Sequence, residues 1–114
     1  MSARIQSFRE FWPFYLSEHG KPGTRLLHFV GTSAALLLIL LAIAVRWWPL
    51  ALMAISCGYA FAWTGHFLIE KNLPATFKYP LWSFVGDWKM WAMMLSGRLE
   101  GELRRLGLKE HHAA

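Results

Sequence analysis

Cysteine and acidic residues are scarce in this sequence, and two long stretches have no charge of either sign. Cys57 is the only cysteine among 114 residues, so the chain cannot form an intramolecular disulfide. No charged residue lies between Leu26 and Val45 or between Pro49 and Ile69. Because 55% of so short a chain is apolar, a soluble domain of this sequence would need an unusually large core.

The two uncharged stretches are each long enough to cross a bilayer, which takes roughly 20 residues of helix. Backbone groups in lipid must be hydrogen-bonded within their own segment, so such stretches form helices. We therefore predict membrane-spanning helices over residues 26–45 and 49–70, joined by a turn at residues 46–49. The expected fold is an all-α membrane protein, in which residues 1–114 form a single domain built on a transmembrane helical hairpin.

Two flanking segments have the apolar spacing of helices that lie on a membrane surface. Apolar residues at intervals of three and four predict an interfacial helix over residues 3–18, in which Pro13 causes a kink or begins a new helix. The same pattern predicts a long amphipathic helix over 81–107, embedded at its start and leaving the surface at its end. A third crossing by the first half of this segment is the alternative, which Asp87 and Lys89 disfavour.

Positive charge is unevenly distributed along the chain. There are 12 basic and 7 acidic residues, giving a net charge of +5, and the hairpin turn holds Arg46 alone. By the positive-inside rule both termini are cytoplasmic, in the inner membrane if the source is bacterial. An anionic lipid surface accounts for these charges, so we expect the bilayer, and no nucleic acid, as the partner. The basic residues around the hairpin include Arg4, Arg9, Lys21, Arg25, Lys71, Lys78, Lys89 and Arg98.

Two histidines lie at matching positions in the predicted hairpin. His28 is near the start of the first apolar stretch and His66 is near the end of the second. Each is about 19 residues from the turn, which places both at one depth on the cytoplasmic side, at roughly 1.5 Å per residue. Small residues that include Gly31 and Gly58 share their helix faces, and small residues allow membrane helices to approach closely. The pattern therefore favours two imidazoles that face one seam.

His19 and Glu70 are candidates to join this pair. His19 lies in the loop before the first span, and Glu70 follows His66 by four residues, on the same predicted helix face. Two or three histidines with a carboxylate and an open position suit ferrous iron, whereas a closed tetrahedral set suits zinc. A hydrogen-bonded histidine at headgroup level, with Glu70 marking the membrane boundary, is the simpler alternative. Haem ligation by His28 and His66 is a third.

Three segments are similar to a known family. They are FYLSEHGKPGTRLLHFVGT (14–32), GHFLIEKNLPATF (65–77) and PLWSFVGDWKM (80–90). These segments resemble a family of small membrane proteins, formerly a domain of unknown function, whose yeast member is a ferrous-iron-dependent 2-hydroxy fatty acid dioxygenase. The resemblance covers most of the chain from residue 14 to residue 100.

The resemblance implies that His19, His28 and His66 are ligands of Fe²⁺ and that Glu70 is a nearby acidic group of the catalytic site. It also implies an oxygen-dependent removal of one carbon from a 2-hydroxy fatty acid, a step of fatty acid alpha-oxidation. We expect a fatty acyl lipid as substrate, its chain between the helices. Candidates for attracting the substrate carboxylate are Arg25, Lys71 and Lys78.

A different class of function fits the same helices. A non-enzymatic membrane module would use its amphipathic C-terminal helix to bind a partner protein or a lipid. A homodimer that buries the small-residue faces is compatible with so small a hairpin, although no motif requires one.

Overall fold

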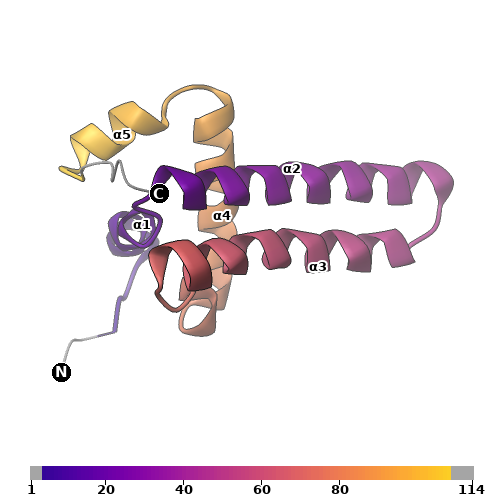
Figure 1. The fold of residues 1–114 in the computed structure, drawn as a ribbon, viewed down its shortest axis with the longest axis horizontal. Coiled ribbons are helices and arrows are strands. Elements are labelled where there is room, and N and C mark those ends of the chain that lie inside the picture. Colours follow the sequence, from indigo (N-terminus) through magenta and orange to yellow (C-terminus); the bar gives the residue numbers. More distant parts are fainter. Residues whose placement is uncertain (1–3, 109–114) are drawn as a thin grey trace.

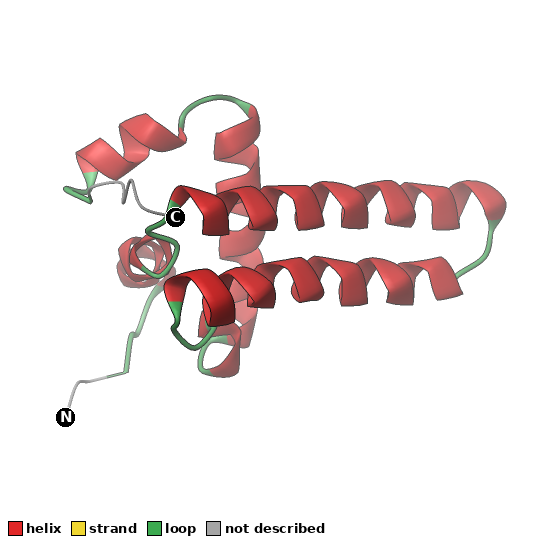
Figure 2. Cartoon of the chain, viewed as in Figure 1, coloured by secondary structure: helices red, strands yellow, loops and turns green. Residues whose placement is uncertain are grey.

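The computed structural model describes residues 4–108, and all regular structure within that range is helical (Figures 1 and 2). This confirms the prediction of an all-α protein. The elements in order are α1 (Phe8–Ser17), α2 (Pro22–Val45), α3 (Pro49–Thr64), the π-helical turn η1 (Gly65–Glu70), the 3-10 turn η2 (Ala75–Phe77), α4 (Pro80–Leu95) and α5 (Leu99–Arg105).

Helices α2 and α3 lie side by side and are joined at the far end of the molecule by a short turn (Figure 1). Pro22–Val45 and Pro49–Glu70 are 24 and 22 residues long, and both are apolar enough to cross a membrane. Less than a quarter of either segment is buried within the protein, unlike the core helix of a soluble domain. The structure thus contains two candidate membrane-spanning helices.

The two helices approach closely where their small residues meet. A Cβ atom added to Gly31 would lie 2.6 Å from the Cβ of Phe61 and 3.2 Å from the carbonyl oxygen of Gly58. Gly58 in turn faces Ala35 on α2. Because these positions have small side chains or none, the two backbones pack closely, an arrangement that is common in membrane helix pairs. His28 and His66 lie on the same two faces, near the opposite end from the turn.

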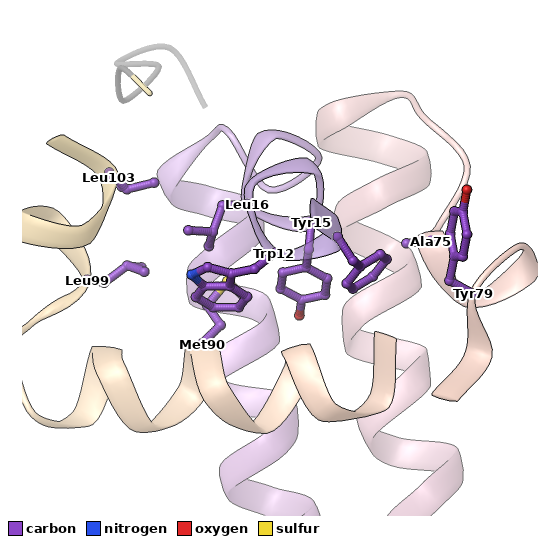
Figure 3. Packing of buried hydrophobic residues seen from close by; sticks show 9 residues of the cluster. Trp12, Tyr15, Leu16, Ala75, Tyr79, Met90, Leu99 and Leu103 are labelled. Atoms are coloured by element: carbon purple, nitrogen blue, oxygen red, sulfur yellow. The ribbon is translucent and has the colours of Figure 1, made fainter. Parts of the chain in front are cut away.

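The other helices gather at the end of the α2–α3 pair where α2 begins and η1 ends (Figure 1). Helix α4 runs across the pair rather than along it, both in Figure 1 and in the close view of Figure 3. It contains 16 residues, fewer than the roughly 20 needed for a crossing. Its length and direction therefore favour a helix outside the spans over a third crossing.

The buried hydrophobic cluster lies at this end of the molecule and is mainly aromatic (Figure 3). Phe11 and Tyr15, one turn apart on α1, are completely buried, and the Trp12 ring stacks on that of Tyr15 with centroids 5.7 Å apart. Helices α4 and α5 close over this face of α1. The members of the cluster are Phe11, Trp12, Tyr15, Leu16, Ala75, Tyr79, Met90, Leu99 and Leu103.

The segment 81–107, predicted as one helix, is divided in two. Gly97 has a φ of +73°, a left-handed conformation that glycine adopts without steric cost. Its N–H donates to the carbonyl of Met94, and the next N–H, from Arg98, donates to the carbonyl of Met93. These two bonds form a Schellman motif, which ends α4 and lets α5 turn back over α1.

The first helix also differs from the predicted range of 3–18, of which residue 3 lies outside the described part of the chain. It begins at Phe8, where the Ser7 hydroxyl caps it by accepting from the N–H of Glu10 at 3.3 Å. It continues through Pro13 as one helix, so no new helix begins there. Its aromatic face is buried against α4 and α5, so α1 is covered by protein on that side.

Candidate functional site

The three histidines singled out from the sequence form one buried cluster. His19 comes from the turn after α1, His28 from the second turn of α2, and His66 from η1. The centroid of the His19 ring lies 4.4 Å from that of His66 and 5.4 Å from that of His28. All three side chains are 3% exposed or less. The cluster lies where the other helices cover the end of the α2–α3 pair that is opposite the turn.

His19 and His66 approach through their outer nitrogens, with the two Nε2 atoms 3.0 Å apart. The Nδ1 of His19 is 2.7 Å from the carbonyl oxygen of Tyr15, which can only accept, so this nitrogen carries the hydrogen. The Nδ1 of His66 is 2.8 Å from the Oδ1 of Asn72. Asn72 donates its Nδ2–H to the carbonyl of Glu18, which fixes Oδ1 toward the ring. Nδ1 of His66 is therefore also a donor.

A neutral imidazole has one N–H, so both Nε2 atoms present lone pairs to each other. Two lone pairs at this distance repel unless a proton lies between them or a metal cation binds both nitrogens from one side. Burial, followed by the neighbouring His66 and His28 rings, lowers the pKa of His19 well below its ordinary value of 6.5. The environment of His19 therefore disfavours a proton between the two Nε2 atoms. A ligating histidine commonly donates its other N–H to an oxygen, as both of these do.

The π-helical turn accounts for the position of His66. After His66 the chain makes wide turns that end at Lys71, which has a left-handed φ of 58°. The N–H of Asn72 donates to the His66 carbonyl at 2.9 Å, while its side chain holds the ring. Asn72 therefore holds His66 by both backbone and side chain. Single π-helical turns of this kind are frequent at functional sites.

His28 has a different partner, Asp87 of α4. Its Nε2 lies 2.9 Å from Oδ1 of Asp87, and the Tyr15 hydroxyl donates to the same oxygen at 2.5 Å. The carboxylate can only accept, so His28 donates through Nε2 and presents its Nδ1 to the Thr32 hydroxyl, 3.4 Å away. Figure 3 shows the Tyr15 side chain reaching from α1 toward α4. Burial, followed by the charge of Asp87, raises the pKa of Tyr15 well above 10, so it remains a donor.

Sequence reasoning gave Asp87 no role in this site and placed Glu70 there instead. The structure uses Glu70 to accept from the backbone N–H of Lys21 at 2.6 Å, which ties the end of η1 to the start of α2. The argument for Glu70 assumed an α-helix, in which residues four apart share a face. The i to i+5 hydrogen bonds of a π-helical turn change that spacing. The available signal for Asp87 was a lone acidic residue within an apolar helix.

The three basic residues considered for carboxylate binding lie away from the histidines' cavity. Arg25 is buried and donates to the carbonyl oxygen of His19 at 2.9 Å, so it supports the turn that carries this histidine. Lys71 forms the left-handed end of η1, and the Lys78 ammonium lies 5.7 Å from the centre of the Tyr79 ring. None of them lines either of the two cavities described next.

Two adjoining cavities meet at His28 and Asp87. The smaller, about 10 Å³, is in the range that holds a single water-sized group. All three histidines line it, together with Trp63, whose buried Nε1–H has no partner among the described residues. The larger, about 380 Å³, is a groove between α2, α3 and α4. Its lining residues are His28, Thr32, Ala35, Ile39, Ala54, Ile55, Gly58, Tyr59, Ala62, Phe84, Asp87 and Trp88.

These residues fit a metal ion in part. Within residues 4–108, no group of three or more His, Cys, Asp or Glu side chains is arranged to hold a metal ion. His19 and His66 supply two neighbouring nitrogen ligands, and Trp63, whose Nε1–H has no partner among the described residues, lines the same small cavity. A third ligand would come from the His28–Asp87 pair, whose hydrogen bond would then have to open.

The fold and the cluster together define a small all-α protein with two candidate membrane-spanning helices and a buried histidine site at one end. A family model described as 2-hydroxy-palmitic acid dioxygenase Mpo1-like matches residues 5–99, a range that includes every residue of the site. The chain belongs to this Mpo1-like family, which confirms the resemblance inferred from the three sequence segments. No curated protein and no solved structure matched the chain.

Proposed function

We propose that the protein is an iron(II)-dependent membrane dioxygenase that shortens 2-hydroxy fatty acids by one carbon. The observation that carries the proposal is the pair of Nε2 atoms of His19 and His66, 3.0 Å apart beside a small cavity that adjoins an apolar groove. The family description supplies the substrate class. With one molecule of dioxygen, a 2-hydroxy acid balances to the shortened acid, carbon dioxide and water, so no further reductant is needed.

His19 and His66 would hold the ferrous ion, with His28 as the third ligand. Ferrous iron bound there would supply the capacity to activate dioxygen. The roles of the protein residues follow from their contacts. Tyr15 and Asn72 orient the two imidazoles by accepting their Nδ1 hydrogens, and burial excludes water from the cluster.

The groove offers a place for the acyl chain. From His28 to Ile39, α2 rises about 16 Å, so the groove runs from the histidines toward the middle of the spans. A volume of about 380 Å³ lies within the range of small-molecule sites. Apart from residues at its polar head its lining is largely aliphatic and aromatic, which suits a hydrocarbon chain.

We further propose that α2 and the α3–η1 segment cross the membrane with the histidine cluster at the cytoplasmic face. The excess of Lys and Arg outside the hairpin turn supports this orientation. Accessibility of single cysteines tests it, with Cys57 replaced by Ser. A cysteine at Trp47, in the turn, should react with an impermeant thiol reagent from outside intact cells, and one at Glu100 should react only after the cells are opened.

The direct test of the activity uses protein purified without oxygen, reloaded with Fe²⁺ and given 2-hydroxypalmitic acid and dioxygen. We expect pentadecanoic acid, measured by mass spectrometry, and its loss in His19→Ala and His66→Ala. Glu100→Gln, an exposed change on α5, is the control that should keep the activity. Absence of the shortened acid from iron-loaded wild-type protein would favour the non-enzymatic membrane module instead.

A further inference from the structure

Asp87 lies where the small cavity and the apolar groove join. It lines both, as do His28, Tyr59 and Ala62. Among residues 4–108 it is the only acidic one in the lining of either cavity, and its side chain is 19% exposed. An occupant with its chain in the groove would therefore bring its polar end to this carboxylate.

The two oxygens of Asp87 differ in what they bind. Oδ1 accepts from the Tyr15 hydroxyl and from Nε2 of His28, at 2.5 and 2.9 Å. Within the described part of the chain, no hydrogen bond ends on Oδ2. Both donors are buried, and both hold the carboxylate through the same oxygen. Oδ2 remains a fixed acceptor with no donor of its own.

We propose that Asp87 positions the substrate by accepting the hydrogen of its 2-hydroxyl group through Oδ2. The identity of the ligand rests on the proposed function, while the role of Asp87 comes from this geometry. A carboxylate can accept a hydroxyl hydrogen but repels a second carboxylate. Asp87 therefore admits the hydroxyl and repels the ligand's own carboxylate.

This arrangement makes Asp87 a residue that discriminates between fatty acids. A 2-hydroxy acid fills the acceptor on Oδ2, whereas the unsubstituted acid leaves that oxygen without a donor at the head of an apolar groove. Sites built to hydrogen-bond a hydroxyl reject analogues that lack it, because a polar group is then left unpaired. Hydrogen bonds to charged groups correspond to roughly a tenfold to hundredfold effect on affinity.

Binding under argon tests the inference without turnover. Intact protein in detergent micelles is titrated with 2-hydroxypalmitate, palmitate and 2-methoxypalmitate, which has the oxygen but no hydrogen to donate. We expect wild-type protein to bind 2-hydroxypalmitate at least about tenfold more tightly than either of the others. Equal affinities for the hydroxy and methoxy acids would overturn the proposal, and this comparison requires no mutation.

The matched variants are Asp87→Asn and Glu100→Gln. Oδ1 must still accept from Tyr15 and His28, so the new amide would present an N–H in place of Oδ2. We expect Asp87→Asn to bind palmitate at least as well as the wild type and to lose most of the preference for the hydroxy acid, whereas Glu100→Gln keeps it. A full preference in Asp87→Asn would refute the role of Asp87. An intact, Asp87-dependent preference without any carbon loss under oxygen would reject the dioxygenase and leave the recognition standing.

Discussion

The Nε2 atoms of His19 and His66 face each other at 3.0 Å while each Nδ1 donates to an oxygen of the protein. One ring is carried by the turn after α1 and the other by the end of the α2–α3 pair. The contact therefore brings together two lone pairs that repel unless a proton lies between them or a metal cation binds both nitrogens from one side. Substitutions of the residues that hold the two rings therefore test this pair as directly as substitutions of the histidines themselves.

Asn72 is the clearest supporting residue. Asn72→Ala removes the acceptor that orients His66, and such losses typically weaken metal binding by about 10- to 100-fold. Competition with a chromophoric chelator under argon measures the change in Fe²⁺ affinity. Asn72→Asp keeps an acceptor and should retain more of the affinity than Asn72→Ala. Unchanged affinity in Asn72→Ala would show that His66 does not bind the ion through Nε2.

Tyr15→Phe should destabilise the protein, because it removes the hydrogen bond that the Tyr15 hydroxyl donates to Asp87. The phenol is fully buried and donates to Oδ1, and loss of a hydrogen bond to a charged group costs about 1.5–3 kcal/mol. The free energy of unfolding in detergent should fall by an amount of that order. Tyr59→Phe is the matched control, because the Tyr59 hydroxyl makes no hydrogen bond to any described residue. Equal effects of the two changes would contradict this assignment.

Close packing of α2 against α3 predicts opposite results at two glycines. Gly31→Ala places a methyl group 2.6 Å from the Phe61 Cβ, and overpacking of this kind costs about 1–3 kcal/mol. Gly101→Ala, on α5, meets no atom closer than 3.9 Å and should stabilise the protein by about 0.4–1 kcal/mol. Thermal unfolding should therefore shift down for the first variant and up for the second. A neutral Gly31→Ala would mean that the helices are farther apart.

Glu102 should make the docking of α5 sensitive to acid. Hydrogen bonds from Arg105, and then from Trp12, help to lower its pKa to about 2 from an ordinary 4.5. Because its folded-state pKa is depressed, its contribution to stability is complete above about pH 4.5 and is lost as the pH falls toward 2. Trp12 fluorescence should report this release. In Glu102→Gln the carboxylate is absent, so that part of the acid dependence should vanish.

The helices could be predicted from the sequence because hydropathy and length determine them. Both candidate spans, and the small residues by which they touch, follow from local pattern. The break at Gly97 depends on one left-handed residue, which an apolar repeat does not reveal. Gly97 itself was visible, but a glycine within a periodic pattern predicts a helix end only weakly.

The site was partly predictable for a similar reason. Counting residues from the turn placed His28 and His66 at one depth, and the loop that returns the chain to the spans brought His19 to them. Asp87 could not be placed, because the direction in which α4 crosses the α2–α3 pair depends on packing between distant segments. Glu70 bonds to the backbone N–H of Lys21, a contact that could not be predicted because the sequence does not indicate a π-helical turn in place of an α-helical one.

The aromatic cluster around α1 has a consequence for the order of assembly. It packs outside the candidate spans, whereas His66 and His28 belong to them. An inserted α2–α3 pair would hold two histidines before α1 folds down, and His19 would arrive with that last step. Binding of the ion would then stabilise the docked position of α1, the last step of folding. In metal-depleted cells, chains whose N-terminal segment is accessible to proteases should therefore accumulate.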